Sequence, residues 1–118
     1  MNQKILIIND DKVILESLKT ILSNHYNLIL TMDSAQALDI LKNDTSISLI
    51  LIDINLPQLN GLPTISSIKE KYPDKNIIIV TGYESVGIEN ESLNLDADGY
   101  IVKPFNSKKI LDTIKKLT

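Results

Sequence analysis

Four apolar runs of the chain are each followed closely by a polar residue that could take part in chemistry. These residues are Asp10, Asp53, Thr81 and Lys103. An ionised carboxylate beside a buried strand is unfavourable unless a cation meets it, so Asp10 and Asp53 indicate a metal site. Mg²⁺ prefers oxygen ligands from one or two carboxylates, with water and a phosphate completing its shell. The four residues together therefore indicate metal-dependent phosphoryl chemistry.

Each of these side chains has a separate task in such a reaction. The Asp53 carboxylate is a nucleophile that can attack phosphorus and form an acyl phosphate. Phosphoryl transfer then needs chiefly positioning and charge neutralisation. Lys103 offers a cation to one phosphoryl oxygen, and the Thr81 hydroxyl offers a hydrogen bond to another. We expect the backbone carbonyl of Asn55 to add a third metal ligand, and Gly82 to leave the approach open.

The elements that must position these residues are five short apolar runs that alternate with longer amphipathic segments. The runs are Ile5–Ile8, Leu28–Leu30, Leu49–Ile52, Ile77–Val80 and Tyr100–Val102. Continuous apolar runs are typical of parallel strands that are covered on both faces. The alternation predicts an α/β protein with a doubly wound (βα)₅ sheet, a fold that binds ligands beyond the carboxyl ends of its strands. Asp10, Asp53, Thr81 and Lys103 all fall at those ends.

Helix starts can be read from capping residues. Either Asp10 or Asp11 is expected to cap the first helix, Asp33 with Gln36 resembles a capping box, and Asn106 or Ser107 caps the last helix. Pro63 suits a first helical turn. The expected helix around Gly87–Leu95 is the weakest, because its glycine, asparagine and serine residues lower helix propensity.

Composition limits the class of protein. The chain has 118 residues, no cysteine and a net charge of −3, and all 12 of its basic residues are lysine. We expect one domain spanning residues 1–118, without disulfides and without a membrane-spanning segment. Direct nucleic-acid binding is not expected, because there is no arginine and no basic stripe with interleaved aromatic residues. The expected compartment is the cytoplasm.

The sequence resembles the receiver domains of bacterial two-component response regulators, of the CheY-like superfamily, over essentially its whole length. The matching pieces are Asn9-Asp10-Asp11, Asp53-Ile54-Asn55-Leu56-Pro57 with Gly61, Thr81-Gly82, and Gly99-Tyr100-Ile101-Val102-Lys103-Pro104-Phe105. The resemblance implies a flavodoxin-like fold with a five-stranded parallel sheet in the order 2-1-3-4-5 and helices on both faces. It also implies a regulatory phosphoacceptor rather than a turnover enzyme.

The resemblance further implies a role for each matching residue. Asp53 would accept a phosphoryl group from a sensor histidine kinase, a phosphotransfer protein or a small phosphodonor, with Mg²⁺ or Mn²⁺ bound by Asp10. Thr81 and Lys103 would sense the phosphoryl group, and Tyr100 would turn inward as Thr81 moves. The Lys103–Pro104 peptide would be cis. The signal would appear on the face formed by the helix around Gly87–Leu95, the strand 100–102 and the last helix, for a downstream effector or effector domain.

Two residues depart from the family pattern. The spacing to Ile14 and Leu18 indicates that Asn9 stands where the family has an acid. Asparagine can accept a hydrogen bond from a metal-bound water but adds no charge, so weaker magnesium binding is expected. Tyr83 is expected to cover the phosphoryl group and to slow its hydrolysis.

The acidic stretch 84–98 and the lysine-rich last helix would support at most a weak homodimer through the same face, because exposed ion pairs contribute about 0–1 kcal/mol each.

Three alternatives belong to other functional classes. The first is a pseudo-receiver that docks proteins without being phosphorylated, although such a module has no need of Asp53, Thr81 and Lys103 together. A flavodoxin-like electron carrier would need a phosphate-cradling first loop, and Asn9-Asp10-Asp11 would repel a phosphate. An aspartyl phosphatase would need a second acid where this chain has Asn55.

Overall fold

The protein is built around one parallel β-sheet. The computed structural model describes residues 3–9, 11–53, 61–81, 98–102 and 106–117. Its five strands lie in the order β2-β1-β3-β4-β5, and every neighbouring pair is parallel. The strands are β1 (Lys4–Ile8), β2 (Asn27–Thr31), β3 (Ile47–Asp53), β4 (Asn76–Thr81) and β5 (Gly99–Val102). The prediction of an α/β fold with a parallel sheet is confirmed.

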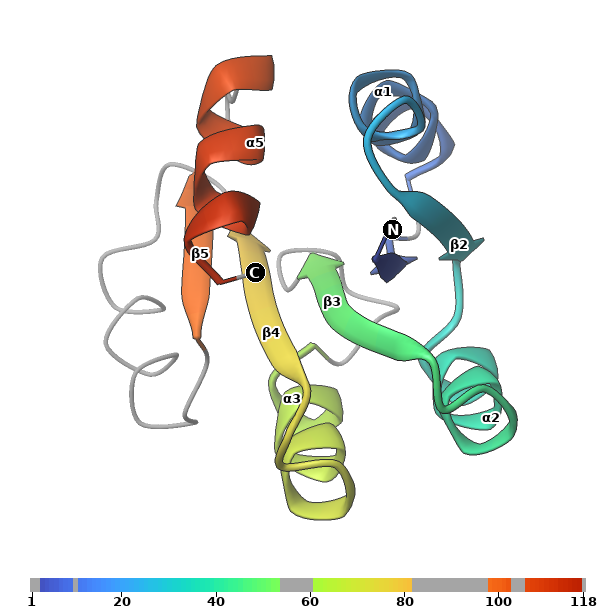
Figure 1. The fold of residues 1–118 in the computed structure, drawn as a ribbon. Coiled ribbons are helices and arrows are strands. Elements are labelled where there is room, and N and C mark those ends of the chain that lie inside the picture. The colour runs from blue at the N-terminus through green and yellow to red at the C-terminus, as the bar shows by residue number, and fades with distance from the viewer. Residues whose placement is uncertain (1–2, 10, 54–60, 82–97, 103–105, 118) are drawn as a thin grey trace.

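Helices cover both faces of this sheet (Figure 1). The described helices are α1 (Lys12–Leu22), α2 (Ser34–Asn43), α3 (Gly61–Lys71) and α5 (Ser107–Lys116). Figure 1 shows α1 and α5 on one side of the sheet and α2 and α3 on the other. The helix expected around Gly87–Leu95 lies outside the described residues. None of the described helices combines the length and the apolar character needed to cross a membrane.

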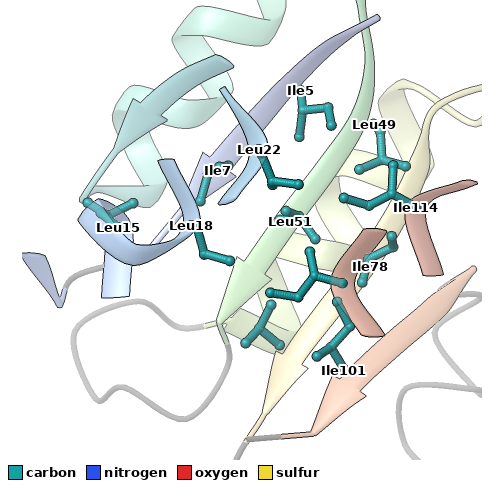
Figure 2. Packing of buried hydrophobic residues seen from close by; sticks show 12 residues of the cluster. Ile5, Ile7, Leu15, Leu18, Leu22, Leu49, Leu51, Ile78, Ile101 and Ile114 are labelled. Atoms are coloured by element: carbon teal, nitrogen blue, oxygen red, sulfur yellow. The ribbon is translucent and has the colours of Figure 1, made fainter. Parts of the chain in front are cut away.

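Each face of the sheet has its own hydrophobic core. Side chains alternate between the faces of a strand, so Ile5 and Ile7 of β1 pack under α1 and α5, whereas Leu6 and Ile8 pack under α2 and α3. Figure 2 shows the first core, in which Leu18 and Ile114 of the two helices meet the strands. The apolar residues of the central strands are at most 1% exposed. Polar side chains are therefore confined to the strand ends.

The capping predictions are confirmed with one correction. Asp33 caps α2 and accepts a hydrogen bond from the Ala35 N–H at 2.9 Å, and Asn106 caps α5 and accepts from the Lys109 N–H at 2.8 Å. Gln36 does not complete a capping box, because its side-chain oxygen accepts from the hydroxyl of Thr31. That hydroxyl is buried at the end of β2, where Gln36 supplies the acceptor it needs.

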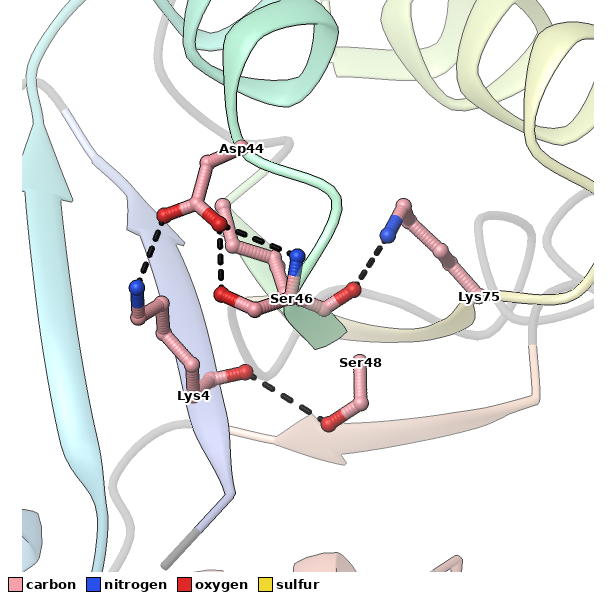
Figure 3. Close-up of polar contacts among 6 residues, drawn as sticks. Lys4, Asp44, Ser46, Ser48 and Lys75 are labelled. Atoms are coloured by element: carbon pink, nitrogen blue, oxygen red, sulfur yellow. Dashed lines mark hydrogen bonds and ion pairs between the residues drawn. The ribbon is translucent and has the colours of Figure 1, made fainter.

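The amino end of the sheet is held together by a polar network (Figure 3). Lys4 of β1 pairs with Asp44 at 2.8 Å, and Asp44 also accepts from the backbone N–H of Ser46 at 3.0 Å. The Lys75 ammonium donates to the carbonyl of Ile47. The hydrogen bond from Lys4, followed by those from Ser46, lowers the pKa of Asp44 from 3.8 to about 2.

The pH dependence of stability provides a test of this network. The lowered pKa of Asp44 means that its ionised form stabilises the fold above pH 3.8, and that this stabilisation disappears as the pH falls towards 2. We expect Asp44→Asn to lower the urea midpoint at neutral pH and to approach the wild-type midpoint as the pH falls through this window. A difference between the two proteins that does not change with pH would contradict the assignment.

Candidate functional site

The carboxyl ends of β3 and β4 place two of the predicted site residues, Asp53 and Thr81, at one edge of the sheet. Asp53 is the last residue of β3 and pairs with Val80 of β4. Thr81 is the last residue of β4 and pairs with Val102 of β5. Neighbouring strands lie about 4.8 Å apart, so the backbones of Asp53 and Thr81 are adjacent. Ile8, the last residue of β1, pairs with Ile52 on the other side of β3.

Several predicted residues lie outside the described part of the chain. They are Asp10, Asn55, Gly82, Tyr83, Lys103 and Pro104. Asp10 stands between the described residues Asn9 and Asp11, and Lys103 directly follows β5. For Tyr100, the structure places the backbone opposite Ile79 of β4. Among the described side chains, no three acidic or histidine residues gather to hold a metal ion. The candidate metal ligands therefore remain those predicted from the sequence.

Asn9 is buried just after β1 and is bonded to the backbone of both Thr31 and Asp11. The residue is 1% exposed, and its backbone N–H donates to the carbonyl of Thr31 at the end of β2, at 3.1 Å. Its side-chain Oδ1 accepts from the Asp11 N–H at 2.8 Å. A short polar side chain that bonds the backbone two residues ahead is a common turn-forming device. Asn9 and Asp11 thus fix the chain on both sides of Asp10.

Asp11 is the residue that caps α1, which answers the question left open by the sequence. Its Oδ1 accepts from the N–H groups of Val13 at 2.9 Å and Ile14 at 3.4 Å, two of the donors that a helix leaves without partners at its start. The capping carboxylate of α1 is therefore that of Asp11.

Thr31 is a site-edge residue that the sequence analysis did not single out. It is 3% exposed and ends β2, its carbonyl accepts from Asn9, and its hydroxyl accepts from the Asp33 N–H at 3.3 Å. It therefore links the turn after β1 to the start of α2. A polar residue directly after the apolar run Leu28–Leu30 was the signal that could have identified it.

Comparison with known families identifies the class of protein to which this chain belongs. Residues 5–115 match the model of the response regulator receiver domain. The chain belongs to this family, which confirms the resemblance inferred from the four motifs.

Curated relatives include a full-length response regulator, MprA of Mycobacterium bovis. It is 33% identical over 118 residues, which cover 99% of this chain and 51% of the relative. The same protein from Mycobacterium tuberculosis matches with the same identity and coverage. The chain thus spans about half the length of the curated relatives it matches.

Solved structures agree with this assignment. A CheY-like receiver domain protein from Methanospirillum hungatei is 35% identical with a TM-score of 0.90, covering 99% of this chain and 94% of the other. A receiver domain from Clostridium thermocellum is 26% identical with a TM-score of 0.89, covering 97% and 92%. The chemotaxis protein CheY4 of Vibrio cholerae has a TM-score of 0.92 at 23% identity over the whole of both chains, and so supports the fold alone.

The helix cap beside the site can be tested through stability. Asp11→Ala removes the acceptor for two N–H groups of α1 and should lower the free energy of unfolding by about 1 kcal/mol, whereas Asp11→Ser should preserve most of it because serine is also a good cap. Urea unfolding monitored by circular dichroism measures both changes. Equal losses in the two variants would show that capping is not the role of Asp11.

Proposed function

We propose that this receiver domain accepts a phosphoryl group on Asp53. The observation that supports the proposal best is the position of Asp53, at the end of the central strand β3 and next to the ends of β1 and β4. The chain continues from β1 into Asp10 and from β5 into Lys103. The groups needed for metal binding and for charge neutralisation therefore follow strands that end at the same edge.

The reaction is an in-line transfer in which the protein supplies position and charge. A carboxylate oxygen of Asp53 forms the new bond to phosphorus, while the bond to the donor breaks and its electron pair leaves with the donor group. Lys103 and the Thr81 hydroxyl stabilise the equatorial phosphoryl oxygens. The product is an acyl phosphate on the chain itself, so the domain is a switch that returns to its starting state by hydrolysis.

The metal would be held by Asp10, Asp53 and the backbone carbonyl of Asn55, which are oxygen ligands of the kind that Mg²⁺ or Mn²⁺ prefers. The ion would neutralise charge between the carboxylate and the incoming phosphoryl group. Asn9 would hold a metal-bound water rather than the ion. An amide oxygen can accept a hydrogen bond from such a water without adding charge.

The response to phosphorylation would pass through Thr81 and Tyr100 on the neighbouring strands β4 and β5. Thr81 moves toward the phosphoryl group and Tyr100 turns inward, which changes the face formed by the helix around Gly87–Leu95, β5 and α5. We propose a sensor histidine kinase or a phosphotransfer protein as donor, and an effector or effector domain as the reader of this face. With such partners the domain would lie in the cytoplasm. The same face would also support a weak homodimer.

The docking-only alternative has no specific support, and the presence of Asp53, Thr81 and Lys103 together argues against it, because a docking-only module has no need of all three. It predicts a chain that folds and binds partners without ever carrying phosphate.

Incubation with acetyl phosphate and Mg²⁺ distinguishes the two functions. Intact mass spectrometry should show the addition of one phosphoryl group to the wild type and none to Asp53→Asn, because asparagine is not a nucleophile toward phosphorus. A wild type that gains no phosphoryl group, even from a donor kinase, would favour the docking module.

The rate of phosphoryl loss tests the role expected for Tyr83. Phosphorylated Tyr83→Ala should lose its phosphoryl group faster than the phosphorylated wild type when intact mass is followed over time. An unchanged rate would reject a shielding role.

Magnesium affinity tests the consequence of Asn9. Asn9→Asp keeps an oxygen that can accept from the Asp11 N–H and adds one negative charge near the metal, so Mg²⁺ should bind more tightly. Isothermal titration calorimetry with the chloride salt measures the change, and Asn9→Ser serves as a neutral control. Equal affinities for wild type and Asn9→Asp would reject the view that Asn9 weakens the site.

A further inference from the structure

A partly buried ion pair lies at the start of β5, on the edge of the sheet opposite the proposed phosphorylation site. The ammonium of Lys69, in the last turn of α3, lies 2.9 Å from Oδ2 of Asp98, and the side chains are 17% and 27% exposed. Asp98 directly precedes β5. The pair therefore joins the end of α3 to the residue that directly precedes β5.

Three hydrogen bonds to or from backbone groups extend this pair into a clamp, which we define as Lys69, Asp98 and Ile77. The Ile77 N–H donates to Oδ2 of Asp98 at 2.8 Å, and the Asp98 N–H donates back to the Ile77 carbonyl at 2.9 Å. Lys69 also donates to the carbonyl of Lys75 at 3.0 Å. One carboxylate oxygen thus fixes the first residues of β4 against the first residues of β5. Hydrogen bonds to charged groups are stronger than neutral ones.

β5 is a short strand at an edge of the sheet. It has four residues, and among the described strands it pairs with β4 alone. The burial of Ile101 selects the face that β5 turns toward α1 and α5, but it does not hold the start of the strand. A shift in register moves every side chain of a strand and everything that follows it. The residue that follows β5 is Lys103.

We propose that Lys69 and Asp98 are positioning residues that fix β5 on β4 and thereby deliver Lys103 to the phosphoryl group. This inference rests on the proposed function, in which Lys103 neutralises phosphoryl charge. The clamp and Lys103 are five residues apart, about 16 Å along an extended strand. The clamp therefore has no direct contact with the reacting atoms and acts only through the strand.

The chain offers a matched control for its removal. Lys4 and Asp44 form an ion pair of 2.8 Å whose side chains are 32% and 27% exposed, also at the amino end of the sheet. Asp44 also accepts a backbone N–H, from Ser46. This pair involves β1 and the segment between α2 and β3, and does not touch β5. Asp44→Ala should therefore match Asp98→Ala in lost stability while leaving the reaction unchanged.

The first measurement is amide hydrogen exchange, which needs no phosphorylation. In Asp98→Ala, and in the milder Lys69→Met, the amides of β5 that bond to β4 should exchange roughly tenfold faster, because a charge-assisted anchor at the strand start is lost. The same amides should keep their rates in Asp44→Ala. Unchanged exchange in both clamp variants, or equal acceleration in the control, would overturn the clamp.

The second measurement is the rate of phosphorylation by acetyl phosphate with saturating Mg²⁺. Asp98→Ala and Lys69→Met should react roughly tenfold more slowly, since small misplacements of a catalytic group are costly, and Asp44→Ala should react as fast as the wild type. In a Lys103→Ala background the clamp substitutions should have no further effect. Mg²⁺ affinity should be unchanged, because Lys103 is not a metal ligand.

If the clamp substitutions slow phosphorylation by the same factor in the wild-type and the Lys103→Ala backgrounds, the positioning role is overturned and the proposed function stands. A wild type that takes no phosphoryl group would overturn both, and the exchange rates would still decide whether the clamp holds β5.

Discussion

The structure depends on the parallel pairing of strands that are buried on both faces. Apart from Ser48 near the start of β3, each residue of β1, β3 and β4 between the strand ends is apolar and nearly inaccessible to water, because helices cover both sides of the sheet. Burying an ionised group in such a layer would cost several kcal/mol. Charged and polar groups are therefore excluded from the sheet and collect at its two edges. Parallel pairing then places all carboxyl ends at one edge and all amino ends at the other.

The two edges use their polar residues in different ways. At the amino edge, Lys4 and Lys69 each pair with an aspartate, and Lys75 bonds a carbonyl. These contacts hold loops and strand starts in place. At the carboxyl edge, Asn9 and Asp11 fix a turn and cap a helix. Asp10 and Asp53 are the acids that we propose for metal binding and phosphoryl transfer, and Asp53 ends β3 at this edge. We propose that the Lys69–Asp98 pair links the amino edge to the proposed phosphorylation site at the carboxyl edge.

The sequence predicted those parts of the fold that depend on local pattern. The apolar runs identified the strands to within two residues, and Asp33 and Asn106 identified helix starts, because both signals arise from neighbours along the chain. Local pattern did not decide between Asp10 and Asp11 as the cap of α1, since both are aspartate, a residue type that suits that position. It also assigned Gln36 to a capping box, whereas the side-chain oxygen of Gln36 accepts a hydrogen bond from the buried hydroxyl of Thr31 on β2.

Long-range ion pairs were not predictable for the same physical reason. Nothing near Lys69 or Asp98 in the sequence distinguishes them from other exposed charges, and only the packing of α3 against the sheet brings them together. The motifs around Asp53, by contrast, were recognisable because their residue types and order reflect chemistry rather than packing. Family membership supports that interpretation.

The central claim is that Asp53 itself carries the phosphoryl group, and chemical trapping tests it most directly. An acyl phosphate is reduced by borohydride, which converts the modified aspartate into homoserine, whereas a free carboxylate does not react. After treatment with acetyl phosphate and Mg²⁺, then borohydride and proteolysis, peptide sequencing by mass spectrometry should find homoserine at position 53. Homoserine at another aspartate, or unmodified aspartate at position 53 in protein known to carry phosphate, would contradict the account.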